Sequence, residues 1–251
     1  MYIYKRTIVC PNSIEIEYYK SIRKVGKYYG GRSRNTSLSN AKQKEANKLR
    51  NILKWSRLID CNFDSSGSFC RFSAPYGIFD TEEKFMREIK NFFSRIKRRC
   101  QKQGIEFKYI GFRECGKSGK NWHMHIVLSE EVRKIAYECW HWKDGGTNFS
   151  PIWTDGKVRG LAEYIRKDVS GEKRMMCSRN LSRPEVTVEP AKKREVAKLE
   201  RGEVCKAPDG WYLSKDEFRS HINEITGASF GFVFRPLIYR NGKKRIEKIR
   251  P

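Results

Sequence analysis

The run NWHMHIVL, residues 121–128, constrains the fold of this chain most, because its side chains alternate with the two-residue period of a β-strand. His123 and His125 share one face of that strand with Val127. Two imidazoles at this spacing lie about 6–7 Å apart at Cβ, near enough to bind one divalent metal ion. The pattern therefore predicts a strand that presents either two metal ligands or two solvated histidines. The apolar face would carry Trp122, Met124, Ile126 and Leu128.

A third ligand is expected from the segment that precedes this strand. Residues 105–114 form a second extended run, and the Gly- and Lys-rich residues 116–121 predict a turn that joins the two runs as a hairpin. The hairpin would return Glu114 to the side of His123 and His125. Such a mixed oxygen and nitrogen set leaves open positions on Mg²⁺ or Mn²⁺. The alternative for Glu114 is an ordinary exposed acid at a strand end.

Residues 111–118, GFRECGKS, also fit the P-loop pattern for nucleotide phosphates. That loop functions only when a helix follows and directs its N-terminus at the phosphate. Here Gly-Lys-Asn and a strand follow. The match therefore favours a hairpin turn over a nucleotide site.

A candidate nucleophile lies further along the chain, on a helix predicted over residues 158–169. A step of 100° per residue places Tyr164 off the apolar stripe, with Lys167 one turn along on the same side. An ammonium there can stabilise a phenolate or a phosphate, so Tyr164 and Lys167 are candidate catalytic residues. The alternative is a surface tyrosine beside a solvated lysine. The stripe consists of Val158, Leu161, Ala162, Ile165 and Val169.

The charge of the chain indicates a polyanionic partner. Its 53 Lys and Arg against 29 Asp and Glu give a net charge of +24, and 13% of its residues are aromatic. Basic groups interleaved with aromatic rings suit single-stranded nucleic acid, although unspecific binding to anionic surfaces is the alternative. No apolar run approaches the ~18 residues that span a bilayer, so a cytoplasmic location without membrane contact is expected. The eight cysteines form no Cys-x-x-Cys pair and are expected to be reduced thiols.

The remaining elements follow from local patterns. Asp80 and Glu83 fit a capping box for a helix that would end at Gly104. Its apolar stripe would contain Phe85, Ile89, Phe92 and Ile96, with Met86 and Phe93 beside it. We also expect a hairpin (2–10 and 14–20), a basic loop (26–39), a helix (40–57), strands (58–63 and 68–75), a basic stretch (192–201), a helix (214–225) that carries His221, and a strand (230–234).

These motifs together resemble the HUH endonucleases, and among them the single-tyrosine rolling-circle replication initiators of phages, plasmids and integrative elements. Residues 51–184 carry the resemblance. His123-Met124-His125 is similar to the family's His-hydrophobic-His motif, and residues 161–167 to its nucleophile helix. Residues 178–181, Ser-Arg-Asn-Leu, resemble a segment just past that helix. Residues 69–73 stand where the first motif strand would be, with Ser73 as their only hydroxyl.

The resemblance implies an α+β fold in which a central antiparallel sheet carries the histidines and is flanked by helices. It implies a metal-dependent endonuclease that nicks and rejoins single-stranded DNA at a replication origin. Tyr164 would become linked to the 5′ phosphate, and Lys167 would assist it. A host helicase and polymerase would act with it in a bacterial or phage-infected cell. The alternatives are a single-tyrosine transposase or mobilisation protein, and a non-catalytic origin-binding module.

The same reading divides the chain into three segments. An N-terminal hairpin, loop and helix (1–50) would precede the endonuclease domain (51–184), and a basic extension (185–251) would follow it. The DNA-binding candidates are Arg71, Ser73, Lys117, Lys120, Arg179 and Asn180.

Overall fold

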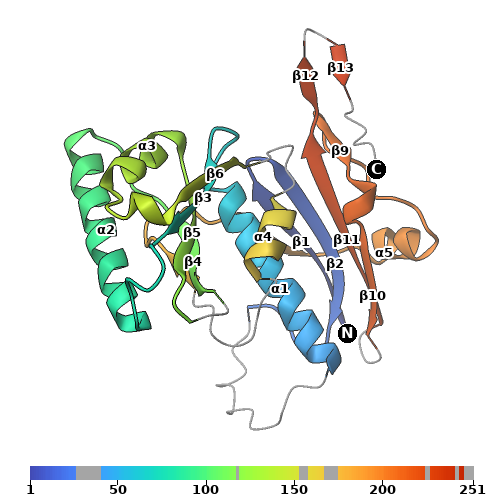
Figure 1. Ribbon diagram of the computed structural model, residues 1–251. Helices are drawn as coiled ribbons and strands as arrows, with labels where there is room; N and C mark the ends of the chain where they lie inside the picture. Colours follow the sequence, from blue (N-terminus) through green and yellow to red (C-terminus); the bar gives the residue numbers. More distant parts are fainter. Residues whose placement is uncertain are drawn as a thin grey trace. The chain divides into compact units, whose positions relative to one another are not determined.

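The computed structural model describes residues 1–26, 41–116, 119–152, 158–166, 175–223, 227–240 and 243–245 (Figure 1). These residues fall into two compact units. One combines Met1–Lys44 with Pro184–Pro251, and the other is Glu45–Arg183. Residue 26 is described at the start of the predicted basic loop, whereas residues 27–39 lie outside the described part. The three-segment division of the chain stays a prediction.

An antiparallel five-stranded sheet in the order β6-β3-β5-β4-β7 forms the centre of the unit Glu45–Arg183. The predicted α+β fold is confirmed, since helices flank this sheet and the histidine strand β5 is its middle strand. Residues 68–75 were expected to form a strand, and β3 occupies most of that range. The strands are β3 (Ser68–Ser73), β4 (Ile110–Cys115), β5 (Trp122–Leu128), β6 (Thr147–Pro151) and β7 (Met175–Cys177).

Helices α2 (Glu82–Lys102) and α3 (Glu130–Cys139) cover one face of this sheet (Figure 1). The predicted stripe of α2 is confirmed, because Phe85, Ile89, Phe92 and Ile96 are all buried against the apolar face of β5. The predicted capping box is wrong. Thr81 caps the helix instead by accepting a hydrogen bond from the Lys84 amide, while Asp80 pairs with the Lys84 ammonium. The short helix η1 (Lys143–Gly145) precedes β6.

The opposite face packs against the end of α1 (Ala41–Asp60) and against α4 (Arg159–Arg166). The strand predicted at 58–63 is wrong, because α1 continues through Asp60. Ile52 and Ile59 are buried two turns apart on one helical stripe, and this helical period outweighs the short apolar run after Arg57. The histidine face of β5 is therefore covered by apolar side chains near its C-terminal end, around Val127.

The other unit is built on an antiparallel six-stranded sheet in which the strand order is β10-β11-β2-β1-β8 and β9 pairs with β11. The predicted N-terminal hairpin is confirmed as β1 (Tyr2–Cys10) and β2 (Ser13–Ser21), and the predicted strand 230–234 lies within β11 (Gly227–Pro236). The basic stretch forms helix α5 (Lys193–Glu200), which packs on Ile16 and Phe232. The remaining strands are β8 (Glu185–Pro190), β9 (Trp211–Leu213), β10 (Arg219–Asn223), and the separate pair β12 (Ile238–Arg240) and β13 (Lys243–Arg245).

The helix predicted over 214–225 is wrong. Only the single turn η2 (Lys215–Glu217) is helical, and β10 follows it, with His221 exposed on that strand. Strand pairing with β11 decides the structure here, together with ion pairs to residues distant in sequence. These long-range partners could not be read from a local pattern.

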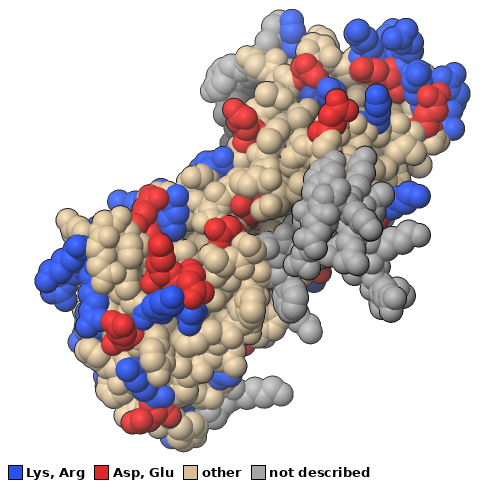
Figure 2. Space-filling view, turned by 90° about the horizontal axis from the view of Figure 1, so that it is seen from above, with Lys and Arg blue, Asp and Glu red and all other residues tan. Residues whose placement is uncertain are grey.

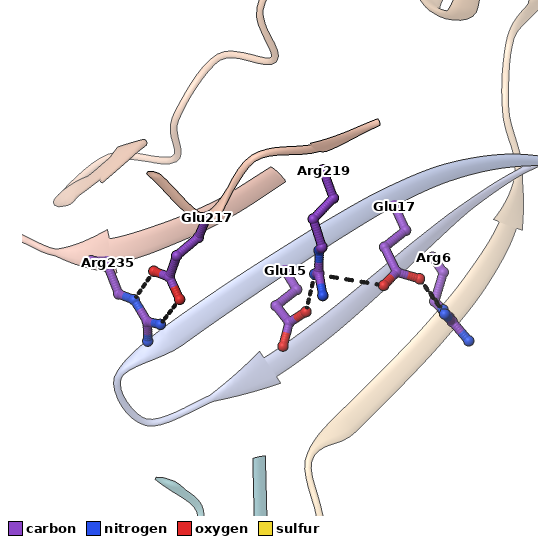
Figure 3. Close-up of polar contacts among 6 residues, drawn as sticks. All are labelled: Arg6, Glu15, Glu17, Glu217, Arg219 and Arg235. Atoms are coloured by element: carbon purple, nitrogen blue, oxygen red, sulfur yellow. Dashed lines mark hydrogen bonds and ion pairs between the residues drawn. The ribbon is translucent and has the colours of Figure 1, made fainter. Parts of the chain in front are cut away.

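Charged side chains tie this sheet together across its strands (Figure 3). Glu17 binds Arg6 on the neighbouring strand and lies 3.8 Å from Arg219 Nη2, which also lies 2.6 Å from Glu15 Oε2. Arg235 donates two hydrogen bonds to Glu217, with N–O distances of 2.9 and 2.5 Å. The Arg235 and Glu217 side chains are only 5% and 11% exposed, so this pair is largely removed from water.

Two sequence expectations concern the chain as a whole. Among the helices of the described residues, none combines the length and hydropathy that crossing a membrane requires. The cysteines are free thiols, and burial raises the pKa of Cys70 to about 12.

Candidate active site

Strands β4 and β5 bring Glu114, His123 and His125 together. Glu114 is the direct ladder partner of His123, while Phe112 is the partner of His125. Glu114 Oε2 lies 3.5 Å from His123 Nε2 and 3.7 Å from His125 Nε2. One ligand atom from each of the three residues lies within 4.8 Å of the others. The group that the hairpin was expected to form is therefore present.

The surroundings of His123 fit a metal ligand. Both histidines are buried, with 7% and 6% of their surface exposed. His123 Nδ1 lies 3.2 Å from the Asn121 carbonyl oxygen, so it can donate there and leave Nε2 directed at Glu114. Burial lowers the pKa of His123, and the Arg71 guanidinium lowers it further, against smaller opposite effects of Asn121 and Glu114. The neutral imidazole that a metal ion requires is therefore favoured.

Two aromatic rings hold the imidazole of His125 between them. The Phe69 ring stacks on it at 5.3 Å between centroids and 13° between planes, and the Phe112 ring stacks at 4.9 Å and 17°. Phe69 comes from β3 and Phe112 from β4, the strands on either side of β5. The ring orientation of His125 is thus fixed by packing, which supports a preorganised ligand position.

Helix α4 places Tyr164 beside this group. Val158 and Ala162 are buried, whereas Tyr164 is 49% exposed, as the helical period predicted. Its ring lies 6.1 Å from the His125 ring and 5.8 Å from the Phe69 ring, edge-on to both. Lys167 lies outside the described residues, as do the side chain of Ile165 and the whole of Val169.

Tyr164 and His125 line one pocket of about 420 Å³. Arg71 is exposed there and pairs in the strand ladder with His125 on one side and Asn148 on the other. The pocket thus offers a cation, an amide and a phenol beside the candidate metal group. Phe69, Asn148 and Ser150 also line it and were not predicted. Asn148 and Ser150 lie on β6, whose five residues gave no strand signal before its pairing with β3 was known.

The predicted DNA-binding residues are not gathered in one place. Ser73 is buried and lies opposite His123 in the ladder, next to the metal group. Lys120 is exposed in the β4–β5 turn, and Lys117 lies outside the described residues. Arg179 and Asn180 line a different pocket, with α2. Their contacts with DNA stay predictions.

The P-loop pattern encloses no helix N-terminus. The Gly119 amide donates to the Gly116 carbonyl at 2.9 Å, the Gly116 amide donates to Asn121 at 2.9 Å, and β5 follows directly. A phosphate cradle of the P-loop kind is therefore excluded at this position.

The charge of the described surface is mixed on the face that Figure 2 shows. Blue Lys and Arg side chains stand among red Asp and Glu side chains on that face. The excess of 53 basic over 29 acidic residues belongs to the chain as a whole. Contact with a polyanion is thus not confined by charge alone to one patch of this face.

The fold and the site define an α+β protein that carries a candidate metal centre on a helix-flanked antiparallel sheet. Residues 78–169 match the family model of the replication-associated proteins of the ORF2 type, and this part of the chain belongs to that family. The matched segment includes Glu114, both histidines and Tyr164. Comparisons with curated proteins and with solved structures gave no match.

Proposed function

We propose that the chain initiates rolling-circle replication by nicking and rejoining single-stranded DNA at an origin, through a covalent 5′-phosphotyrosine at Tyr164. The observation that carries this proposal is the position of Tyr164, whose ring lies 6.1 Å from that of His125 at the pocket that both residues line. The family match to replication-associated proteins over residues 78–169 supports the biological setting.

The chemistry is a transesterification at phosphorus. The Tyr164 oxygen forms a bond to the scissile phosphorus and gives up its proton, while the bond from phosphorus to the 3′ oxygen breaks and that oxygen gains a proton. One phosphodiester replaces another, so the reverse attack of a 3′ hydroxyl rejoins the strand. Mg²⁺ or Mn²⁺ bound by Glu114, His123 and His125 would polarise the phosphate oxygens.

The side chains of the pocket have separate tasks in this proposal. Arg71 supplies a positive charge to the phosphate, and Asn148 can orient the sugar–phosphate backbone by hydrogen bonds. Phe69 and Phe112 keep the His125 ring in place. We assign to Lys167 the stabilisation of the Tyr164 oxygen, on the basis of its position one helical turn away in the sequence.

The proposed partners are single-stranded origin DNA and the host helicase and polymerase, which would unwind and copy the template. A single-tyrosine transposase or mobilisation protein would use the same transesterification on another DNA sequence. A non-catalytic origin-binding module would bind DNA and form no covalent link. Covalent adduct formation separates this last alternative from the others.

The proposal is tested by incubating the chain with a pool of single-stranded oligonucleotides in Mn²⁺, with an EDTA control. Denaturing electrophoresis should show a protein–DNA adduct only with the metal ion, and sequencing of the attached DNA should return one site. A site from a replication origin supports initiation, and a site from a transposon end supports the transposase. Absence of any adduct while DNA is bound would support the non-catalytic module.

A further inference from the structure

A second pocket, of about 690 Å³, lies on the α2 face of the unit Glu45–Arg183. Its walls are α2, residues 105–109 before β4, and residues 178–180 after β7. Its volume falls within the range of small-ligand sites, about 300–1,000 Å³. Tyr109 in its wall is five residues before Glu114, or about 16 Å along an extended chain. The pocket is thus separate from the candidate active site, which lies on the other face of the sheet.

Three aromatic rings form one wall. The Phe93 and Tyr109 rings lie 4.4 Å apart between centroids, and the Phe107 and Tyr109 rings lie 5.1 Å apart with 30° between their planes. All three side chains are only partly buried, so ring surface faces the pocket. Exposed aromatic faces of this kind stack with unpaired nucleobases.

Two cations border the same wall. Lys97 and Arg179 are exposed and line the pocket, from α2 and from the segment after β7. Two other arginines of α2 are ion-paired, Arg95 with Glu88 and Arg99 with Glu138. Within the described part of the chain, no ion pair engages Lys97 or Arg179. Their charges are available to an anionic group of a ligand.

Hydrogen bonds between the two loop walls hold the pocket in shape. The Ser178 amide donates to the Tyr109 carbonyl at 3.0 Å, and the Tyr109 amide donates to Ser178 Oγ at 3.2 Å. Asn180 Nδ2 donates to Glu106 Oε1 at 2.9 Å and to the Phe107 carbonyl at 3.3 Å. A ligand therefore meets a largely preformed surface, which lowers the entropic cost of binding.

We infer that this pocket binds an unpaired nucleobase against Phe107 and Tyr109, with the adjoining phosphate at Lys97 and Arg179. The ligand is either a base of a DNA single strand or a free nucleotide, since both carry this chemistry. A flat apolar wall beside two cations fits a base and phosphate better than a carboxylate-rich peptide, which needs no stacking surface. The inference goes beyond the proposed nicking function and does not depend on it.

The test measures binding of the full-length chain by fluorescence anisotropy in EDTA, so that cleavage does not interfere. The probe is a labelled oligothymidylate of roughly 15 nucleotides, compared with an abasic strand of the same length. Phe107→Leu should weaken binding of the oligothymidylate by roughly 5- to 150-fold and leave abasic binding unchanged. Tyr137→Leu, which alters an exposed ring on α3, is the matched control and should change neither affinity.

Two further variants protect the test against misfolding and charge effects. Ser94→Trp adds a ring at an exposed position of the pocket, so it should block base binding without removing core packing. Lys97→Gln/Arg179→Gln should weaken oligothymidylate binding more than Arg98→Gln/Lys102→Gln, which removes two charges from α2 outside the pocket. Circular dichroism checks that each variant is folded.

Equal affinities for the base-bearing and abasic strands, or equal effects of Phe107→Leu and Tyr137→Leu, would overturn the inference. Competition by an acidic peptide as strongly as by oligothymidylate would overturn it as well. Displacement of the probe by thymidine 5′-monophosphate assigns a free nucleotide to the pocket, and its failure to displace assigns the strand. Tyr164→Phe should bind like the unaltered chain here, so failure of the nicking proposal leaves this result distinct.

Discussion

Glu114 faces His123 directly across the β4–β5 ladder, with its Oε2 3.5 Å from the imidazole Nε2. The same carboxylate oxygen lies 3.7 Å from His125 Nε2. A slip of one residue in this ladder would turn Glu114 to the opposite face of the sheet. The register of one short hairpin therefore determines whether the candidate metal group exists.

The first prediction separates the metal group from the P-loop pattern on the same hairpin. Glu114→Ala should abolish Mn²⁺ binding and nicking, because it removes the only carboxylate of the group. Lys117→Ala should cost at most a modest part of the DNA affinity. Isothermal titration with Mn²⁺ and with ATP, and a nicking assay, measure both variants. Loss of ATP binding in Lys117→Ala, with Glu114→Ala unchanged, would show that the hairpin is a nucleotide site.

The second prediction concerns the close approach of β4 to β5 at Gly111. A Cβ at this position would lie 2.3 Å from the His125 carbonyl oxygen and 3.0 Å from Ile126 Cα, both of them backbone atoms. Gly111→Ala should therefore push the strands apart, lower the free energy of unfolding by about 1–3 kcal/mol, and weaken Mn²⁺ binding.

Gly160→Ala is the matched control for this change. Gly160 lies in α4 with no heavy atom within 4 Å of the added Cβ, and alanine favours a helix by about 1 kcal/mol. Urea denaturation should show this variant to be at least as stable as the unaltered chain. If Gly111→Ala unfolds at the same urea concentration as Gly160→Ala, the described strand contact is wrong.

The third prediction concerns the ion pair Arg235–Glu217. Glu217→Ala leaves the Arg235 guanidinium largely buried without its carboxylate, and the loss of such a partner costs about 3–5 kcal/mol of unfolding free energy. Glu189→Ala removes the partner of Lys5 at a carboxylate that is 59% exposed, so it should cost at most about 1 kcal/mol. Urea denaturation of both variants compares the two losses. Equal losses would contradict the burial described for Arg235.

The fourth prediction concerns the pocket at Tyr164. Arg71→Gln should lower the nicking rate and reduce the salt dependence of single-strand binding by about 0.7 in the logarithmic slope, because one phosphate contact is lost. Its Mn²⁺ affinity should stay nearly unchanged, since Arg71 is not among the candidate ligands. Binding titrations at several salt concentrations measure the slope. A slope equal to that of the unaltered chain would remove Arg71 from the phosphate site.

The sequence predicts the centre of the site well because its signals are local. Alternation over residues 121–128 defines β5, and the turn residues that follow Glu114 determine which residues of the hairpin meet. The helical period of α4 is equally local, and it separates exposed Tyr164 from buried Ala162. Each of these inferences needs no knowledge of a distant partner.

The parts that could not be predicted depend on such partners. Asn148 and Ser150 reach the pocket only because β6 pairs with β3, nearly 80 residues earlier in the chain. Residues 219–223 are a strand because β11 and Glu15 hold them, although the local sequence favours a helix. The stacking of Phe69 and Phe112 on His125 likewise requires the order of three strands.

The most direct test of the proposed function is to identify the amino acid that becomes linked to DNA. The full-length chain is incubated with its selected oligonucleotide and Mn²⁺, the adduct is digested with protease and nuclease, and the modified peptide is sequenced by mass spectrometry. We expect the phosphate on Tyr164, and we expect Tyr164→Phe to bind the oligonucleotide normally while forming no adduct, because it loses the nucleophile but little contact area. An adduct on another residue, or an undiminished adduct in Tyr164→Phe, would contradict the account.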